Sequence, residues 1–149
     1  MAERCAVVGV GQTKHATTRE LSMGGLCREA IDRALEDAQV TVGEVDAVVM
    51  GKAPDMFEGS MMPELSLTEA LGAVGKPLIR VHTAGSVGGS TVNVGVSLIE
   101  AGIHERVLVV GWEKQSDAEA MWVLSPKVPF SNRMGGGAGG AFAPHVRAY

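Results

Sequence analysis

Residues 78–112, LIRVHTAGSVGGSTVNVGVSLIEAGIHERVLVVGW, decide the fold of this chain. The apolar run at residues 78–82 follows a Lys-Pro pair and predicts a strand. Small residues at 83–90 predict a turn that opens a helix, and this helix extends to about Ala101. A second apolar run at residues 105–112 predicts another buried strand. Strands that alternate with helices in this way are typical of a layered α/β sheet.

The residues before this stretch predict the same alternation. Residues 4–10, RCAVVGV, form a continuous apolar run that predicts a buried strand, and residues 46–51, DAVVMG, predict another. Between them, apolar residues recur at helical spacing on one face, with Ser22 as the N-cap. This face consists of Met23, Leu26, Cys27, Ala30, Ile31, Ala34 and Leu35. The order strand, helix, strand indicates a parallel pair with a right-handed crossover.

A loop and a short helix are expected between the second and third predicted strands. Residues 53–63 contain proline and glycine and predict the loop, and residues 64–72 predict the helix. The inward positions of this helix are Leu65, Ala70 and Leu71. The acidic side chains of this region are expected to be solvated charges, and they are Asp55, Glu58, Glu64 and Glu69.

The end of the chain shows no clear hydrophobic period. Its glycine run at residues 135–140 lacks the Lys-Ser/Thr of a P-loop, so we expect a flexible lid or a linker. We therefore divide the chain into an α/β core at residues 1–115 and a loop segment at residues 116–149. A chain that stops just past such a loop is expected to be a truncated form of a longer protein.

Composition excludes several classes of protein. Hydrophobic residues make up 46% of the chain and charged residues 20%, which is a globular composition. The net charge is −4, aromatic residues make up 4%, and no basic block occurs, so nucleic-acid binding is not expected. No apolar run reaches the roughly 18 residues that a membrane span needs. Two cysteines cannot make a disulfide framework, and the sequence therefore indicates a reducing, cytoplasmic location.

Gly9-Val10-Gly11 follows a predicted strand, as the first glycines of a dinucleotide-binding fingerprint would. The third glycine of that fingerprint falls at Lys14, and no clear helix starts there. The sequence therefore favours a glycine turn at the end of a strand over a nucleotide site.

The turn at residues 83–90 is the first candidate site. Backbone N–H groups at the start of the helix that follows have no intrahelical partner, and the helix dipole favours negative charge there. Such a turn can stabilise an oxyanion, a phosphate or a thiolate. Close packing of a helix on a sheet also selects small residues, and this structural reading remains open.

The same stretch, continued to GWEKQS at residues 111–116, resembles the nucleophile-helix region of thiolases. The likeness is to the sterol carrier protein X and lipid-transfer-protein type, and three further segments share it: AVVGVGQTKH, SMGGLCREAIDRAL and DAVVMGKAPD. The resemblance implies the amino-terminal half of a layered αβαβα fold with a mostly parallel sheet flanked by helices. It also implies a coenzyme A thioester as substrate, with no further cofactor and no metal.

The resemblance places the nucleophilic cysteine of thiolases at Gly85. Glycine has no side chain, so a thioester intermediate cannot form at that position. Ser86 is adjacent, but a serine nucleophile needs a positioned base and would point elsewhere on the turn. Cys5 and Cys27 lie in apolar patterns and are interpreted as core residues.

The substrate-binding set that follows from the resemblance is His82, Gly85, Ser86 and Gly88. His82 precedes the turn, and a hydrogen-bonded histidine at a strand end is the simpler interpretation of it. The other histidines are scattered without metal-ligand spacing, and they are His15, His104 and His145. The catalytic histidines and the second cysteine of thiolases belong to the carboxy-terminal half of the family's chains, and no residue here corresponds to them.

Two functions of different classes remain open. The first is an enzyme on acyl-CoA carbon–carbon bonds, either an acyltransferase or, because of Gly85, a retro-aldol lyase that works with an OB-fold/zinc-ribbon partner protein. The second is a non-catalytic acyl-CoA- or lipid-binding fragment or degenerate subunit. The resemblance also implies a homodimer, with the strand that carries His82 near its interface. The chain alone is expected to be inactive.

Overall fold

The computed structural model describes residues 4–16, 20–53, 59, 61–117 and 137–149. These residues form three parallel strands, four α-helices and three short 3-10 helices. Their order is α1 (Met23–Ala38), η1 (Val42–Glu44), β1 (Ala47–Gly51), α2 (Pro63–Leu67), β2 (Leu78–Val81), η3 (Ala84–Ser86), α3 (Val87–Glu100), β3 (Val107–Gly111), η4 (Gln115–Asp117) and α5 (Gly137–Ala148).

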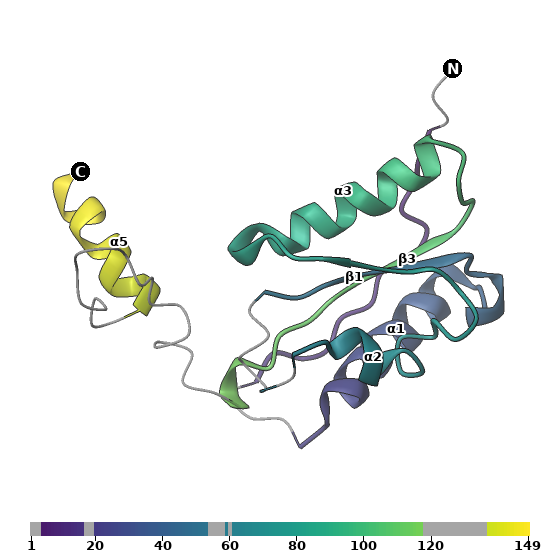
Figure 1. Cartoon of the computed structure of the whole chain (residues 1–149), viewed down its shortest axis with the longest axis horizontal. Helices are drawn as coiled ribbons and strands as arrows, with labels where there is room; N and C mark the ends of the chain where they lie inside the picture. The colour runs from purple at the N-terminus through teal and green to yellow at the C-terminus, as the bar shows by residue number, and fades with distance from the viewer. Residues whose placement is uncertain (1–3, 17–19, 54–58, 60, 118–136) are drawn as a thin grey trace. The chain divides into compact units, whose positions relative to one another are not determined.

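The sheet has the strand order β2-β1-β3, and every pair is parallel. In the register, Val48 lies beside Leu78 and Val49 beside Val109. All five residues of the central strand β1 are buried, which is typical of a parallel sheet covered on both faces. In Figure 1, α3 lies on one face of the sheet and α1 with α2 on the other. The predicted layered α/β fold is confirmed.

The hydrophobic core lies mainly on the α1 and α2 face. Alternate residues of the strands point to it, because successive side chains of a strand point to opposite faces. The buried members of this core are Cys27, Ile31, Val45, Val48, Met50, Leu67, Leu71, Ala73, Leu108 and Val110.

The helix α1 begins and ends as its sequence predicts. The Ser22 hydroxyl accepts a hydrogen bond from the Gly25 N–H at 3.1 Å and caps the first turn. The helix ends at Ala38, and its C-cap residue Gln39 adopts the left-handed conformation with φ 56° and donates its N–H to the Glu36 carbonyl. Cys27 and Ile31 of the predicted apolar face are both 1% exposed. The predicted N-cap and face are confirmed.

The helix α3 approaches the sheet closely at two glycines. A Cβ atom at Gly51 would lie 2.0 Å from the Thr91 hydroxyl oxygen, and one at Gly95 would lie 2.6 Å from Val109 Cγ2. The Thr91 hydroxyl is itself engaged, since it donates to the Val87 carbonyl at 2.6 Å. The separation between α3 and the strands β1 and β3 is therefore set by residues that lack a side chain.

The predicted buried strand at residues 4–10 is wrong. Residues 4–16 contain no strand, and Val7, Val8 and Val10 are 78%, 70% and 69% exposed. The reason is that this segment has no neighbouring backbone to pair with among the described residues, because a groove separates it from β3. An apolar run becomes a strand only when such a neighbour lies within hydrogen-bonding distance.

Several smaller differences concern boundaries. The helix predicted at 64–72 is shorter, since α2 ends at Leu67, and Leu65 is 73% exposed instead of inward. Leu71, by contrast, is fully buried as predicted. The first four residues of β3 alternate between half-buried and buried and the last, Gly111, is exposed, so the strand is less enclosed than predicted. The helix α5 was not predicted, and it includes the last residues of the glycine run. Of the predicted loop at 53–63, residues 54–58 and 60 lie outside the described residues, and so do residues 118–136 of the loop segment predicted at 116–149.

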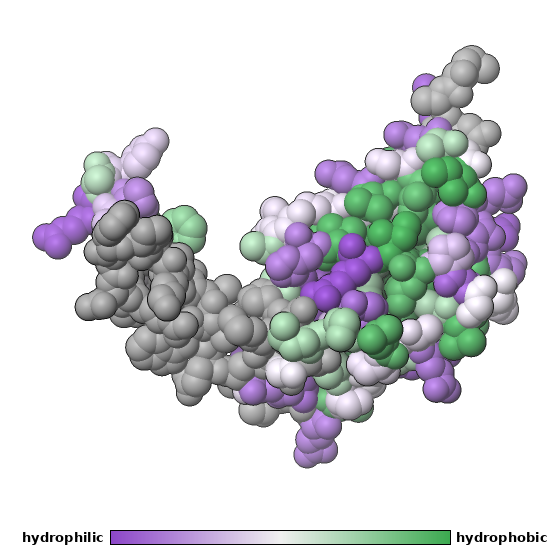
Figure 2. All heavy atoms as spheres, viewed as in Figure 1, coloured by the Kyte–Doolittle hydropathy of each residue, from purple (hydrophilic) through white to green (hydrophobic). Residues whose placement is uncertain are grey.

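The chain divides into two compact units. The first contains the sheet with α1, α2 and α3, and the second contains η4 and α5. On the face shown in Figure 2, hydrophobic side chains of the first unit gather beside α3, with hydrophilic ones around them. No helix among the described residues is long and apolar enough to cross a membrane.

Candidate functional site

The candidate site lies where β2 ends and α3 begins. The strand stops at Val81, the 3-10 turn η3 follows two residues later, and α3 starts at Val87. In a parallel sheet the carboxyl ends of all strands meet at one edge, so the residues after β1 and β3 lie at this edge too. In open α/β sheets this is the edge at which ligands bind.

Three hydrogen bonds hold the turn together. The Ser86 hydroxyl donates to the Thr83 carbonyl at 2.8 Å, and the Ser86 N–H donates to the same oxygen at 3.2 Å. The Thr83 hydroxyl donates to the Ser90 hydroxyl at 2.8 Å. Because the Ser86 side chain is engaged with Thr83, it does not cap α3. The Val87 N–H donates to the Ala84 carbonyl, and no side chain caps the N–H groups that follow it in the first turn of α3. A helix start of this kind can bind a negatively charged or polarised oxygen.

Gly85 has room for a side chain. A Cβ atom there would have no heavy atom within 4 Å, and its φ is not among the positive values of the chain's glycines. Neither packing nor backbone conformation therefore requires glycine at this position. The residue before it does carry strain, since Ala84 has a φ of 47° in the left-handed region. Such outliers are concentrated at functional turns.

The predicted set His82, Gly85, Ser86 and Gly88 lies together on this turn and on the first turn of α3, and all four residues are exposed. Within the described residues, His82 makes no hydrogen bond or ion pair, so the interpretation of a hydrogen-bonded histidine finds no partner there. No group of three His, Cys, Asp or Glu side chains that could hold a metal ion occurs in the described part of the chain.

Sequence reasoning missed a buried charge pair at the same edge. Lys52 directly follows β1 and is fully buried, and Glu113 is the second residue after β3. The Lys52 Nζ lies 3.5 Å from Oε2 of Glu113. The Ala53 N–H donates to the other oxygen of the Glu113 carboxylate. This carboxylate therefore joins the ends of β1 and β3. The signal was a lysine immediately after the apolar run VVMG, where burial is expected and charge is not.

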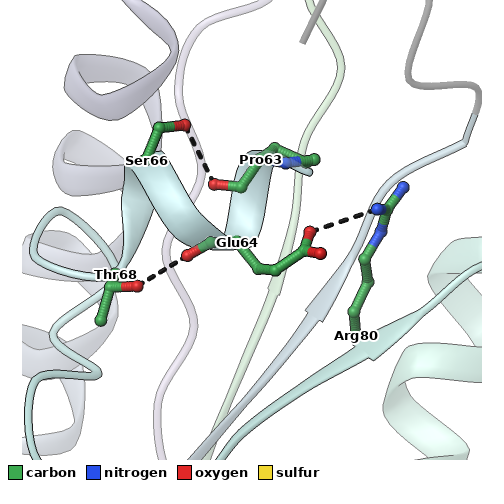
Figure 3. Close-up of polar contacts among 5 residues, drawn as sticks. All are labelled: Pro63, Glu64, Ser66, Thr68 and Arg80. Carbon is green, nitrogen blue, oxygen red and sulfur yellow. Dashed lines mark hydrogen bonds and ion pairs between the residues drawn. The ribbon is translucent and has the colours of Figure 1, made fainter. Parts of the chain in front are cut away.

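Glu64 is the second missed contact, and the prediction that it is only a solvated charge is wrong. Figure 3 shows its carboxylate pointing from α2 toward Arg80 on β2, at 3.2 Å from Nη1. Its carbonyl accepts a hydrogen bond from the Thr68 hydroxyl at 2.6 Å. The pair ties α2 to β2, the strand that leads into the candidate site. Asp55 and Glu58 lie outside the described residues.

Fold and turn together define a thiolase-like α/β protein. The profile described as "Thiolase, N-terminal domain" matches residues 5–133. This chain therefore belongs to the thiolase family.

Relatives of the chain carry names from this family. "Sterol carrier protein 2" of Homo sapiens is 33% identical over 116 residues, which are 76% of this chain and 21% of that protein. "Acetyl-CoA acetyltransferase" of Methanothermobacter thermautotrophicus is 30% identical over 116 residues, which are 75% of this chain and 30% of that protein. The chain thus spans less than a third of the length of either relative.

Solved structures share the fold. The 3-oxoacyl-(acyl-carrier-protein) synthase III from Aquifex aeolicus VF5 superposes with a TM-score of 0.57 at 22% identity, over 67% of this chain and 32% of that one. The priming β-ketosynthase from the R1128 polyketide biosynthetic pathway gives a TM-score of 0.54 at 22% identity, over 70% and 32%.

Proposed function

We propose that this chain is the part of a longer thiolase-family protein that presents the acyl-CoA thioester to the reacting groups, and that the whole protein acts on a carbon–carbon bond of that substrate. The observation that carries the proposal is the turn between β2 and α3, with an uncapped helix start in a chain of this family. Two free cysteines, Cys5 and Cys27, fit a reducing cytoplasmic location.

The chemistry proposed for the turn is oxyanion stabilisation. The N–H groups that follow Val87 in the first turn of α3 would bind the thioester carbonyl oxygen as negative charge develops on it. Gly85 provides no thiol, so no acyl-enzyme would form there. A retro-aldol reaction needs none: a base removes the β-hydroxyl proton, the Cα–Cβ bond breaks, and a carbonyl product leaves. The electron pair remains as the enolate of the shortened acyl-CoA, which then takes up a proton.

The base for this reaction would come from outside the 149 residues, and the partners we propose are a second copy of the protein and an OB-fold/zinc-ribbon protein. The hydrophobic side chains beside α3 on the face in Figure 2 support a covered surface there.

A non-catalytic acyl-CoA- or lipid-binding role is the second candidate. Gly85 favours it, because the position that the resemblance assigns to the nucleophile has no reactive group. The name of one relative, "Non-specific lipid-transfer protein-like 2" of Caenorhabditis elegans, 27% identical over 123 residues, belongs to the same class of role.

The test compares the 149-residue chain, the longer parent protein and the parent with Gly85→Cys. Each is assayed for thiolysis of a 3-oxoacyl-CoA and for retro-aldol cleavage of a β-hydroxyacyl-CoA, and acyl-CoA binding is measured by calorimetry. We expect retro-aldol cleavage by the parent and a gain of covalent acylation only in Gly85→Cys. Ser97→Cys, an exposed position further along α3, is the matched control and stays unacylated.

Acyl-CoA binding without either reaction in all three proteins would support the binding role and exclude the enzyme. No acyl-CoA binding by the parent would exclude both. Acylation of wild type and Gly85→Cys alike would show that the nucleophile lies elsewhere.

A further inference from the structure

The buried pair of Lys52 and Glu113 lies beside the place where α3 rests on the sheet. Lys52 directly follows Gly51, the last residue of β1, and its Nζ lies 3.5 Å from Oε2 of Glu113. Apolar residues of similar size often stabilise such a position as well as an ion pair does, because burying two charges costs free energy. The best-attested use of a buried ion pair is to fix one arrangement of the elements that carry it. The elements that carry this pair are the carboxyl ends of β1 and β3.

The first turn of α3 rests on the end of β1 at Gly51. A Cβ atom at Gly51 would lie 2.0 Å from the Thr91 hydroxyl oxygen and 3.2 Å from Cγ2 of Val87, so both side chains lie directly against this glycine. The Thr91 hydroxyl donates to the Val87 carbonyl at 2.6 Å, which ties the two residues together. Figure 1 shows α3 along one face of the strands. The position of Gly51 therefore sets the position of the N–H groups that follow Val87.

Contacts past the end of the sheet hold Gly51 in its place. The paired register of β1 and β3 ends at this glycine, and the Trp112 N–H donates to its carbonyl at 3.3 Å. The Ala53 N–H donates to one oxygen of the Glu113 carboxylate, and Lys52 forms its ion pair with the other. The chain passes into the second compact unit after Ala53 and again after Glu113. The carboxylate therefore joins two strand ends at the points where the chain leaves the unit that holds the sheet.

We propose that Lys52 and Glu113 are positioning residues for the candidate site. They hold the end of β1 on which the first turn of α3 rests, and in this way they direct the N–H groups of that turn toward the thioester carbonyl oxygen. The inference rests on the proposed function, which supplies that oxygen. Donors stabilise a developing oxyanion only at hydrogen-bond distance from the position that it reaches, so a small shift of α3 lowers the rate.

Steady-state kinetics of the longer parent protein provide the first test. The double variant Lys52→Met/Glu113→Gln removes one charge of each sign and so keeps the net charge. We expect its kcat for retro-aldol cleavage of a β-hydroxyacyl-CoA to fall at least ~10-fold, with KM within ~2-fold, because the lost stabilisation belongs to the transition state. Asp46→Asn is the matched control, since the Asp46 carboxylate accepts the Arg106 N–H and joins the same two strands at their opposite ends. Its kcat should stay within ~2-fold of wild type.

A thiol placed on the turn gives a readout that needs no activity. In the parent with Gly85→Cys, the helix start favours the thiolate, which reacts with iodoacetamide. Adding Lys52→Met/Glu113→Gln should slow alkylation of this thiol at pH 6.5 at least ~3-fold, because the N–H groups of α3 no longer face it. Adding Asp46→Asn should leave the rate within ~1.5-fold. Mass spectrometry of the peptide that contains position 85 measures the rate and separates this thiol from Cys5 and Cys27.

Unchanged alkylation in the double variant overturns the inference, and so does an unchanged kcat in an active parent. Equal losses in the double variant and in Asp46→Asn also overturn it, because a general loosening of the sheet would then be the cause. If the double variant does not fold, Glu113→Gln alone, which keeps an oxygen for the Ala53 N–H, is judged by the same two readouts. Slower alkylation in a parent that cleaves no β-hydroxyacyl-CoA would leave the positioning standing and remove the proposed function. Cleavage by a parent whose alkylation ignores the pair would do the reverse.

Discussion

Lys52 and Glu113, at the edge of the sheet that holds the candidate site, are the charged pair whose burial costs the most free energy. An isolated ammonium group is expensive to bury, and Lys52 is fully buried while Glu113 is 23% exposed. The Glu113 carboxylate offsets that cost and also accepts the Ala53 N–H. One carboxylate thus joins the ends of β1 and β3, and removing it would remove a contact at both ends.

We predict that Glu113→Ala lowers the free energy of unfolding by about 2–4 kcal/mol, because it leaves the buried Lys52 without this carboxylate. The double variant Lys52→Met/Glu113→Gln should recover at least half of the loss, since no buried charge remains. Urea unfolding followed by circular dichroism measures both. A double variant as unstable as the single one would show that the pair is not the source of the effect.

Asp46 is a residue whose charge stabilises the opposite end of the sheet. Its carboxylate accepts the Arg106 N–H at 2.8 Å and the Glu105 N–H at 2.9 Å, and these hydrogen bonds hold the pKa of Asp46 below its ordinary value of 3.8. A lowered folded-state pKa means that the stabilisation is fully present above the unfolded-state pKa. It is lost as the pH falls through the lower folded-state value.

We therefore predict that Asp46→Asn lowers the free energy of unfolding at neutral pH. The variant should also lose less of this free energy than wild type as the pH falls from about 5 to the pH at which the protein unfolds. Thermal unfolding as a function of pH measures this. Asp32→Asn is the control, because the Asp32 carboxylate lies exposed on α1 in an ion pair with Arg28. Equal acid sensitivity of wild type and Asp46→Asn would refute the prediction.

At the scale of elements, the position of α3 depends on contacts that only glycine permits. The Gly51 Cα meets the buried Thr91 side chain, whose hydroxyl is already bonded within α3. Gly89, on the first turn of the same helix, has no neighbour within 4 Å of a built Cβ. Gly51 on β1 and Gly89 on α3 thus have different roles.

We predict that Gly51→Ala destabilises the chain by about 1–3 kcal/mol, because α3 must move away from β1. Gly89→Ala should stabilise it by up to about 1 kcal/mol, because alanine favours a helix. Both changes are measurable by thermal or urea unfolding. If the two variants behave alike, helix–sheet contact does not explain the glycine at position 51.

At the scale of the whole molecule, two adjoining cavities of about 330 and 240 Å³ beside β3 leave apolar surface open to solvent in the 149-residue chain. They are lined by residues 5–11, α1, α3 and β3, and we call them the β3 groove. Val8 lines both cavities of the groove and is 70% exposed, whereas Val74 is 67% exposed away from it. Contiguous apolar surface of this kind binds hydrophobic dyes and promotes association.

We predict that the chain binds the dye ANS and that Val8→Lys reduces this binding at least ~3-fold, because a charge enters the apolar groove. Val74→Lys introduces the same charge outside the groove and should leave dye binding within a factor of ~1.5. Fluorescence titration at fixed protein concentration measures both. Equal reduction by the two variants would mean that the dye binds elsewhere.

Much of this architecture could be predicted from local pattern. The α1 face, its Ser22 cap, the strand at 47–51 and the turn before α3 all follow from spacing and residue type. The site turn could be located because a strand, small residues and a helix succeed one another there. Leu65 shows the limit, since an apolar residue on a short helix turned out to be exposed.

The contacts between distant residues could not be predicted in this way. Lys52 and Glu113 are separated by 61 positions in the sequence, and no local pattern around either residue indicates that they pair. The ion pair of Glu64 with Arg80 has the same character. Such pairs arise only when the order of strands in the sheet is settled.

The sequence by itself determined the α/β class, the helix and strand types of the central elements, the family resemblance and the turn at 83–90, because periodicity and turn chemistry are local properties. Only the tertiary structure decided that residues 4–10 are no strand here, that Lys52 is buried against Glu113, and that a groove lies beside β3. The physical reason is that a strand forms only where a neighbouring strand supplies its hydrogen bonds, and a charge is stable when buried only where a partner lies beside it. Both conditions depend on which distant segments the fold brings together.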